Sequence, residues 1–384
     1  MNNISYSFPY LLFLFYLFLF VLWEFSLKAK GDRRLKKIRI VIWGSFLFFF
    51  GLRGFVNTDC LSYYPFFEGL KTVWDGYSYG YVLSEYDWEP GFITVVYLLK
   101  SIIPNYFVWT FVWTLIAIIA LDSFFARNVK YYSLGFLLFF IFGGYGILVN
   151  LMRGSIAMFI FLYSIRFLEK GDSKKYFLVN TVGCLFHISS VLYLLAYFIL
   201  KRRLSFPFLL GVFLFLNLLY WLRIDFSNIL IPIMNNISYE RISLLVESYI
   251  EEGSNGELLS IGYIERCFTY IVVLMMYTKL ARSKPDSIIY LNAYVLYYIL
   301  FYFFWQIDAA SQRMAGLFIF SYWIIYSDLY AILKIPNNKK LFLLLLLVYS
   351  SLKMISGQSQ PYHQYKNILF NNERFEEAER RIQM

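Results

Sequence analysis

Residues 11–23 read LLFLFYLFLFVLW, an apolar run without a charged side chain. A second run of this kind, LFLLLLLVYS, occupies residues 341–350. A helix needs roughly 20 mainly apolar residues to cross the hydrocarbon core of a bilayer, and these runs match that requirement. Their polarity does not alternate from residue to residue, as it would in the strands of a membrane barrel. The sequence therefore predicts an all-α, polytopic integral membrane protein.

The composition of the 384 residues agrees with this class. Hydrophobic residues make up 60 % and charged residues 16 %, whereas soluble domains are about half apolar and a quarter charged. The formal net charge of +10 does not indicate nucleic-acid binding, because the basic residues lie mainly in short loops between the apolar runs, as expected for cytoplasmic loops. The three cysteines are widely spaced and indicate neither a disulfide framework nor a zinc site.

Charge also predicts the orientation of the chain. The densest basic cluster, KAKGDRRLKK at residues 28–37, is assigned to the cytoplasm. The first apolar segment lacks a cleavage signal and is taken as a retained span. The amino terminus and the loop 57–90 are then external, and this loop carries many carboxylates against the single Lys71. Both termini are therefore predicted to lie outside a bacterial cytoplasmic membrane.

Two apolar segments do not fit ordinary spans. Residues 91–103, GFITVVYLLKSII, are short, contain Lys100 and stop at Pro104. If they crossed the membrane, the basic loop 169–175 would become external, so we expect a surface or re-entrant helix. Residues 176–200 lie between two basic loops but are too short for two spans, so we expect a pair of short helices that meet near His187.

The remaining apolar segments bring the prediction to about ten full spans with additional short helices. Besides the helix that leads into Arg53, the spans are expected at residues 8–27, 106–125, 131–149, 153–168, 204–222, 260–279, 286–304, 313–333 and 339–353. These spans form a domain of residues 1–353 with outer loops 57–105 and 223–259. A polar tail follows at 354–384, in which ERFEEAERR predicts a short surface helix.

Ionisable and aromatic residues gather at the predicted outer ends of the spans. Inserting an ionisable side chain at the middle of the bilayer costs about 2.5 to 3.5 kcal/mol of free energy, and the cost is lower at the membrane interface. Guanidinium groups that converge there would match the oxygens of a diphosphate. The residues concerned are Arg53, Asp59, Glu89, Arg153, His187, Asp308, Arg313, Tyr362 and Tyr365, with Tyr63 and Tyr64 as rings that could stack on sugars.

Each candidate also has a structural interpretation. Arg53 could simply extend to lipid head groups, and Asp59 could close the turn Asn57-Thr58-Asp59. Arg153 begins a helix, where a cation opposes the helix dipole, so it is expected to have an anionic partner. We expect Arg313 to open a helix too, with Asp308 as an alternative ion-pair partner. His187 is either a satisfied structural residue or a proton acceptor at a helix break.

Five blocks of the sequence together resemble a known family. They are GLRGFVNTDCLSYYPFF (51–67), WEPGF (88–92), the long stretch from LVNLMRGS to SSVLYLL (148–195), QRMAGLFIFSYWIIYSDL (312–329) and PYHQYKNIL (361–369). In order and spacing they resemble the EpsG-like branch of the Wzy polysaccharide polymerases. The resemblance implies a GT-C-like polymerase architecture.

The resemblance also implies a function. Such polymerases join oligosaccharide repeat units carried on undecaprenyl diphosphate, outside the cytoplasmic membrane, for a capsule, O-antigen or exopolysaccharide. Donor and acceptor would both be lipid-linked, with a flippase and a chain-length regulator as partner proteins. Arg53, Arg153 and Arg313 would bind the diphosphates, His187 or Asp59 would be the base, and Glu89 would shape the acceptor site. No cofactor and no metal are expected, because diphosphate is already a leaving group. A flippase for the same lipid, or a membrane O-acyltransferase, remains an alternative.

Overall fold

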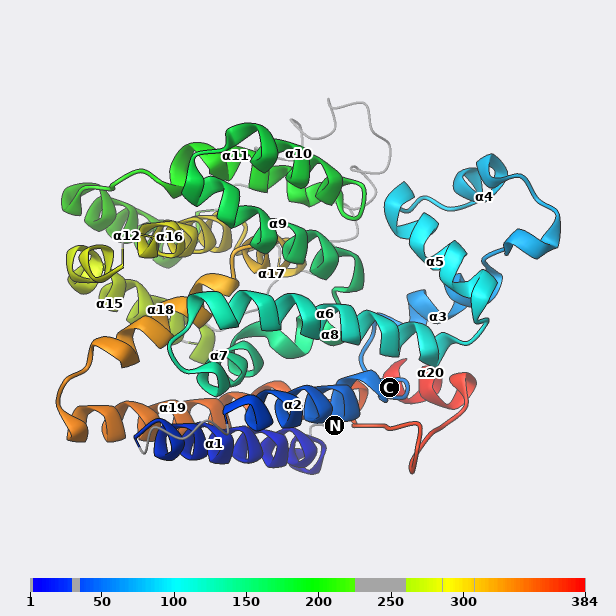
Figure 1. The fold of residues 1–384 in the computed structure, drawn as a ribbon, viewed down its shortest axis with the longest axis horizontal. Helices are drawn as coiled ribbons and strands as arrows, with labels where there is room; N and C mark the ends of the chain where they lie inside the picture. The colour runs from blue at the N-terminus through cyan, green and yellow to red at the C-terminus, as the bar shows by residue number, and fades with distance from the viewer. Residues whose placement is uncertain (1–2, 30–34, 225–259, 285, 307, 384) are drawn as a thin grey trace. The chain divides into compact units, whose positions relative to one another are not determined.

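The computed structural model describes residues 3–29, 35–224, 260–284, 286–306 and 308–383. These residues are helical and contain no strand beyond one isolated bridge between Arg53 and Asn367. The chain forms two compact units, one of residues 1–194 with 326–384 and the other of residues 195–325 (Figure 1). The expected outer loop 223–259 lies almost entirely outside the described residues.

The first unit contains most of the helices. They are α1 (Phe8–Ala29), α2 (Leu35–Phe46), α3 (Cys60–Gly69), α4 (Tyr79–Glu85), α5 (Pro90–Ile102), α6 (Tyr106–Asn128), α7 (Tyr132–Phe139), α8 (Tyr145–Val149), α9 (Met152–Lys170), α10 (Ser173–Cys184), α19 (Pro336–Gly357) and α20 (Phe375–Gln383). The first helix packs against α2, α7 and α19, which are far apart in the sequence (Figure 1).

The second unit contains α12 (Phe206–Trp221), α15 (Ile261–Ser283), α16 (Ser287–Phe303) and α17 (Asp308–Gly316). Two helices, α11 (Val191–Leu200) and α18 (Phe320–Ile332), extend across the boundaries between the units. Buried tyrosines fill its interior: the ring of Tyr298 lies 4.4 Å from that of Tyr270 and 4.5 Å from that of Tyr302, centroid to centroid. Aromatic burial of this kind holds the unit together.

Four helical segments of the described chain are long and apolar enough to cross a membrane, namely Ile4–Lys28, Tyr106–Asn128, Tyr132–Val149 and Pro336–Gly357. Shorter apolar helices occur at Pro90–Ile102, Ile188–Leu200, Phe206–Trp221 and Ser287–Phe303. The prediction of a helical membrane protein is confirmed at this level. The total of about ten full spans stays a prediction.

Basic segments of the first unit meet at one end of its helices. Lys28 donates a hydrogen bond to the carbonyl of Lys130, and Arg127 forms an ion pair with Glu169. We call this the basic end. The intervening α5 has 13 residues, about 20 Å of helix, which is shorter than the hydrocarbon core. The length of α5 and the proximity of the basic segments agree with the surface or re-entrant helix expected at residues 91–103, which stays a prediction.

The apolar segment 176–200 is broken where expected. Helix α10 ends at Cys184, and a 3-10 turn at Ile188–Ser190 leads into α11. Between them His187 has an extended backbone, with φ −161° and ψ 118°. The break therefore places His187 at the junction of α10 and the 3-10 turn, where its amide still donates to the Gly183 carbonyl at 3.2 Å.

Two expected spans are interrupted instead of continuous. Residues 131–149 bend at Phe142 and Gly143, where Gly143 has φ 89°, a left-handed conformation that favours glycine. The expected span 313–333 is divided, because α17 ends at Gly316 and α18 begins only at Phe320. The expectation that Arg313 opens a helix was wrong: it lies in the last turn of α17, where the helix dipole favours a cation.

The carboxy-terminal segment folds back on the residues after α2. The Gly54 amide donates to the Lys366 carbonyl at 2.9 Å, and the Asn57 amide donates to the Tyr362 carbonyl at 2.7 Å. The Ile368 amide donates to the Leu52 carbonyl at 2.9 Å. These hydrogen bonds fix the path of the chain immediately before Asp59, so this part of the tail is a structural element of the first unit.

Replacing Arg381 of α20 by alanine is expected to destabilise this arrangement. Its guanidinium donates to the carbonyls of Pro361 (2.7 Å) and Phe55 (2.8 Å) and pairs with Glu373. Hydrogen bonds to charged groups contribute about 1.5 to 3 kcal/mol, so Arg381→Ala should lower the melting temperature in detergent. The exposed Arg380 is the matched control. An equal melting temperature for Arg380→Ala and Arg381→Ala would contradict the structural role of the tail.

Candidate functional site

Three of the candidate side chains meet in the first unit. The Arg153 Nη1 lies 2.7 Å from Glu89 Oε2, and the His187 Nδ1 lies 3.2 Å from Glu89 Oε1. The Ile188 amide donates to the same Oε1 at 3.3 Å. Glu89 therefore bridges an arginine and a histidine that are separated by 34 residues in the sequence.

Local structure explains how these side chains come together. Glu89 precedes α5, whose first residue is Pro90, a favoured position for proline. Arg153 is the second residue of α9, and His187 stands at the break after α10. The Gly91 amide donates to the Leu185 carbonyl at 2.9 Å, which joins the start of α5 to the end of α10.

Gly91 is expected to tolerate no side chain. A Cβ at this position would lie 2.7 Å from the Leu185 carbonyl oxygen and 2.9 Å from its Cβ. Gly91→Ala should therefore push α5 away from α10, cost about 1 to 3 kcal/mol of stability and separate Glu89 from His187. Gly80 in α4 is the control, because a Cβ there would meet nothing within 4 Å. Thermal unfolding of both variants tests this, and an unchanged Gly91→Ala would contradict the close packing.

Aromatic rings form the wall around Arg153. The guanidinium lies 4.8 Å from the centroid of the Trp88 ring, a cation–π contact. The buried Tyr63 ring packs edge-on against Trp88 at 5.3 Å and interacts with Arg153. Within the described part of the chain the Nε of Arg153 has no hydrogen-bond partner. Arg153 is thus held on two sides and keeps an unused donor.

The charges of the site are defined by its contacts. Burial alone would raise the pKa of Glu89, but the hydrogen bond from His187 and the charge of Arg153 outweigh it and lower this pKa to about 2. Burial raises the pKa of Tyr63 to about 12, and the nearby Asp59 carboxylate adds to that shift. Glu89 is therefore ionised at neutral pH, and Asp59 lies at the margin of the same site.

Arg53 belongs to a different cluster. It is 5 % exposed and donates to the Phe50 carbonyl (2.7 Å) and the Thr114 hydroxyl (3.2 Å). Beside it the Tyr145 hydroxyl contacts His363 Nδ1 at 2.9 Å. Burial lowers the pKa of His363 to about 4, so this imidazole is neutral at physiological pH. Arg53 thus lies among neutral hydrogen-bonding groups, and its backbone forms the isolated bridge to Asn367 of the returning tail.

The other candidates are distributed over both units. Tyr362 and Tyr365 lie in the returning tail, where the Tyr365 hydroxyl donates to the Phe49 carbonyl at 3.0 Å. Tyr64 stacks on Phe375 of α20 at 4.5 Å. Asp308 and Arg313 are on α17 in the second unit. The structure therefore joins Arg153 with Glu89 and His187 and places Arg53 in the tail cluster.

Several residues that position the site are not predicted from the sequence. Trp88 and Gly91 lie beside Glu89 in WEPGF, but this block alone indicates no role for either of them. His363, one of only two histidines, is a further residue that the sequence does not single out. Its place in PYHQYKN, next to the two selected tyrosines, was the available signal.

The arrangement has the parts of an acid–base site with an anion-binding group. A carboxylate that accepts from one imidazole nitrogen orients the ring and fixes its tautomer, as in hydrolase triads. The second nitrogen of His187 is then available to accept a proton. In the described chain, histidine, cysteine, aspartate and glutamate do not gather in threes, as a protein metal site would need.

Comparison with known protein families identifies the family of this chain. The EpsG family model matches residues 36–367, which covers most of the chain and includes Glu89, Arg153 and His187. No curated protein and no solved structure matches the chain at a significant level. Since the family match spans far more than half of the sequence, the chain belongs to the EpsG family, a family of polysaccharide polymerase-like membrane proteins.

Proposed function

We propose that this protein is a polysaccharide polymerase that joins oligosaccharide repeat units linked to undecaprenyl diphosphate. The transfer would take place at the outer side of the bacterial cytoplasmic membrane. The observation that carries the proposal is the bridge of Glu89 between Arg153 and His187, because it combines a proton acceptor with a cation that suits a diphosphate.

In the proposed reaction, a hydroxyl of the acceptor repeat unit attacks the anomeric carbon of the donor sugar. Its proton passes to Nε2 of His187, and Glu89 stabilises the imidazolium that forms. The bond between the anomeric carbon and the diphosphate oxygen breaks, and the electron pair leaves with the lipid diphosphate. Arg153 stabilises the negative charge on that leaving group through its Nη groups.

Exposed aromatic rings of the segment between α3 and α5 would bind the sugars. In the segment between α3 and α5, Trp74 is 80 % exposed, and Tyr77 and Tyr81 stack on each other at 5.0 Å while remaining exposed. Aromatic rings are suited to pack on the apolar faces of sugar rings. We assign this segment to the saccharide part of the substrate, with Tyr63 closer to the reacting diphosphate.

Purified protein with lipid-linked repeat units tests the function directly. A polymerase lengthens the glycan, which electrophoresis of the released saccharide detects. A flippase would move the lipid across vesicles without lengthening it, and an O-acyltransferase would need an acyl donor and leave the chain length unchanged. We expect elongation without added metal and in the presence of a chelator. Absence of elongation by protein that is folded and supplied with substrate would refute the polymerase proposal.

A further inference from the structure

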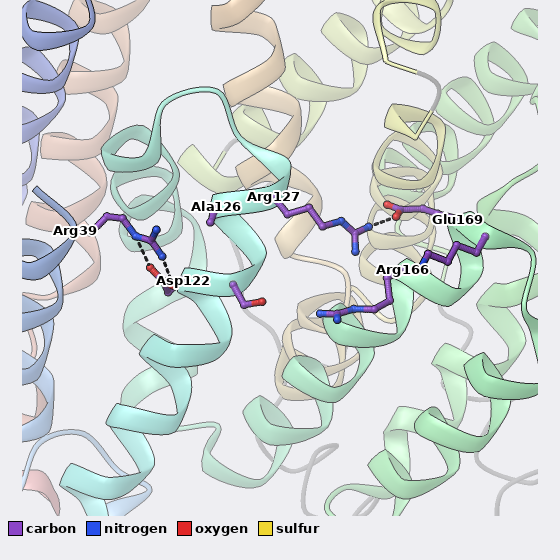
Figure 2. A pocket seen from close by; sticks show the side chains of 8 residues that line it. Arg39, Asp122, Ala126, Arg127, Arg166 and Glu169 are labelled. Carbon is purple, nitrogen blue, oxygen red and sulfur yellow. Dashed lines mark hydrogen bonds and ion pairs between the residues drawn. The ribbon is translucent and has the colours of Figure 1, made fainter. Parts of the chain in front are cut away.

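The basic end of the first unit carries a groove that the proposed reaction does not use. It has a volume of about 700 Å³ and lies among α2, α6 and α9 (Figure 2). Four cations and two carboxylates line it: Arg39, Arg127, Arg166, Lys170, Asp122 and Glu169. Arg153 and Arg166 are 13 residues apart on α9, which corresponds to roughly 20 Å. The groove is therefore at the opposite end of this helix from the candidate site.

The groove has more positive than negative charge available. Arg39 is bound by Asp122, with Nε to Oδ1 at 3.1 Å and Nη2 to Oδ2 at 2.5 Å. Arg127 pairs with Glu169, as Figure 2 shows. Within the described residues, neither Arg166 nor Lys170 forms an ion pair with a carboxylate. Two cations thus remain at the groove to meet an anion.

A second, apolar groove lies next to the polar one, on α6, α9 and α10. Its volume is about 350 Å³, and its lining includes Ile116 of α6 and Ile156, Ile160 and Tyr163 of α9. On α9 these residues repeat at intervals of three or four and lead to Arg166, so they share one helix face. The Arg166 guanidinium lies 3.7 Å from the centroid of the Tyr163 ring, which marks the junction of the two grooves.

We propose that the two grooves together bind an anionic phospholipid. The phosphate would contact Arg166 and Lys170, and one acyl chain would lie over Ile116, Ile156 and Ile160. A soluble anion would use only the polar half, whereas an amphiphile fills both. Basic pockets between membrane helices at the cytoplasmic side are suited to anionic head groups. This lipid is distinct from the reacting substrate, whose diphosphate belongs at Arg153.

The proposal can be tested with full-length protein in phosphatidylcholine nanodiscs with or without phosphatidylglycerol. Native mass spectrometry and thermal unfolding would measure lipid retention and stabilisation. Since each basic side chain near the surface contributes about 1 kcal/mol, the double variant Arg166→Ala, Lys170→Ala should bind phosphatidylglycerol about 10- to 30-fold more weakly. Lys174→Ala is the control, because Lys174 is exposed on α10 and does not line the groove.

A second variant tests the apolar groove. It provides an independent result if the double variant misfolds. Ile160→Trp should obstruct the chain groove and reduce retention of phosphatidylglycerol while all the cations remain. Inorganic phosphate should neither stabilise the protein as phosphatidylglycerol does nor displace the lipid. Unchanged lipid retention by both variants would refute the proposal, and so would equal retention of phosphatidylcholine or full competition by phosphate.

Discussion

Replacing Arg153 by alanine is expected to lower the rate of glycan elongation by about 100- to 1,000-fold, so that the products remain single repeat units. Removal of one preorganised donor to a developing negative charge has this magnitude in comparable sites. Arg153 is fixed by Glu89 at 2.7 Å and by the Trp88 ring, so little reorganisation is needed when the diphosphate leaves. Elongation of purified lipid-linked repeat units by the variant measures the effect.

Two further variants distinguish charge from geometry at this position. Arg153→Lys keeps the positive charge but loses the planar fork, so we expect an intermediate rate. Arg380→Ala removes an exposed arginine of α20 and should elongate normally. The variants must be compared at equal amounts of monodisperse protein in detergent. Polymer of full length from Arg153→Ala would exclude Arg153 from the reaction.

The sequence predicted local features of the fold better than long-range pairings. Apolar length predicted α1, α6 and α19, because membrane crossing sets a length that is readable in one dimension. Residues 91–103 and 176–200 are too short for the spans that the basic loops around them would require. This conflict predicted the short α5 and the break at His187. The bend at Gly143 and the division between α17 and α18 were not predicted. Both lie in continuous apolar runs, whose hydrophobicity does not indicate where a helix is interrupted.

For the candidate site, too, the sequence predicted individual residues but not the contacts between them. Glu89, Arg153 and His187 each stand out in the sequence as an ionisable residue in an apolar context. The sequence predicts an anionic partner for Arg153, but only the folded chain identifies Glu89 as that partner. Pairing of the tail with residues 52–57 was also unpredictable, because backbone hydrogen bonds carry no residue-type signature. This pairing places Arg53 beside the returning tail, whereas Arg153 lies with Glu89 and His187.

Replacing His187 by alanine should decrease elongation by about 100- to 10,000-fold, the usual contribution of a general base. It should also change the pH dependence. A general base must be unprotonated to accept a proton, so the native rate, measured between about pH 5 and 8, should rise with pH. Glu89 cannot produce this rise, because its pKa of about 2 leaves it ionised throughout that range.

The other histidine gives the matched comparison for this pH profile. His363 is buried against Tyr145, and burial lowers its pKa to about 4, so it stays neutral between pH 5 and 8 and cannot produce the rise. His363→Ala should lower the melting temperature, because it removes a contact of the returning tail, while the rise of the rate with pH persists. The residual activity of His187→Ala should instead be nearly independent of pH between 5 and 8. A rise that survives in His187→Ala would assign the proton transfer to another group, with Asp59 at the margin of the site as the next residue to replace.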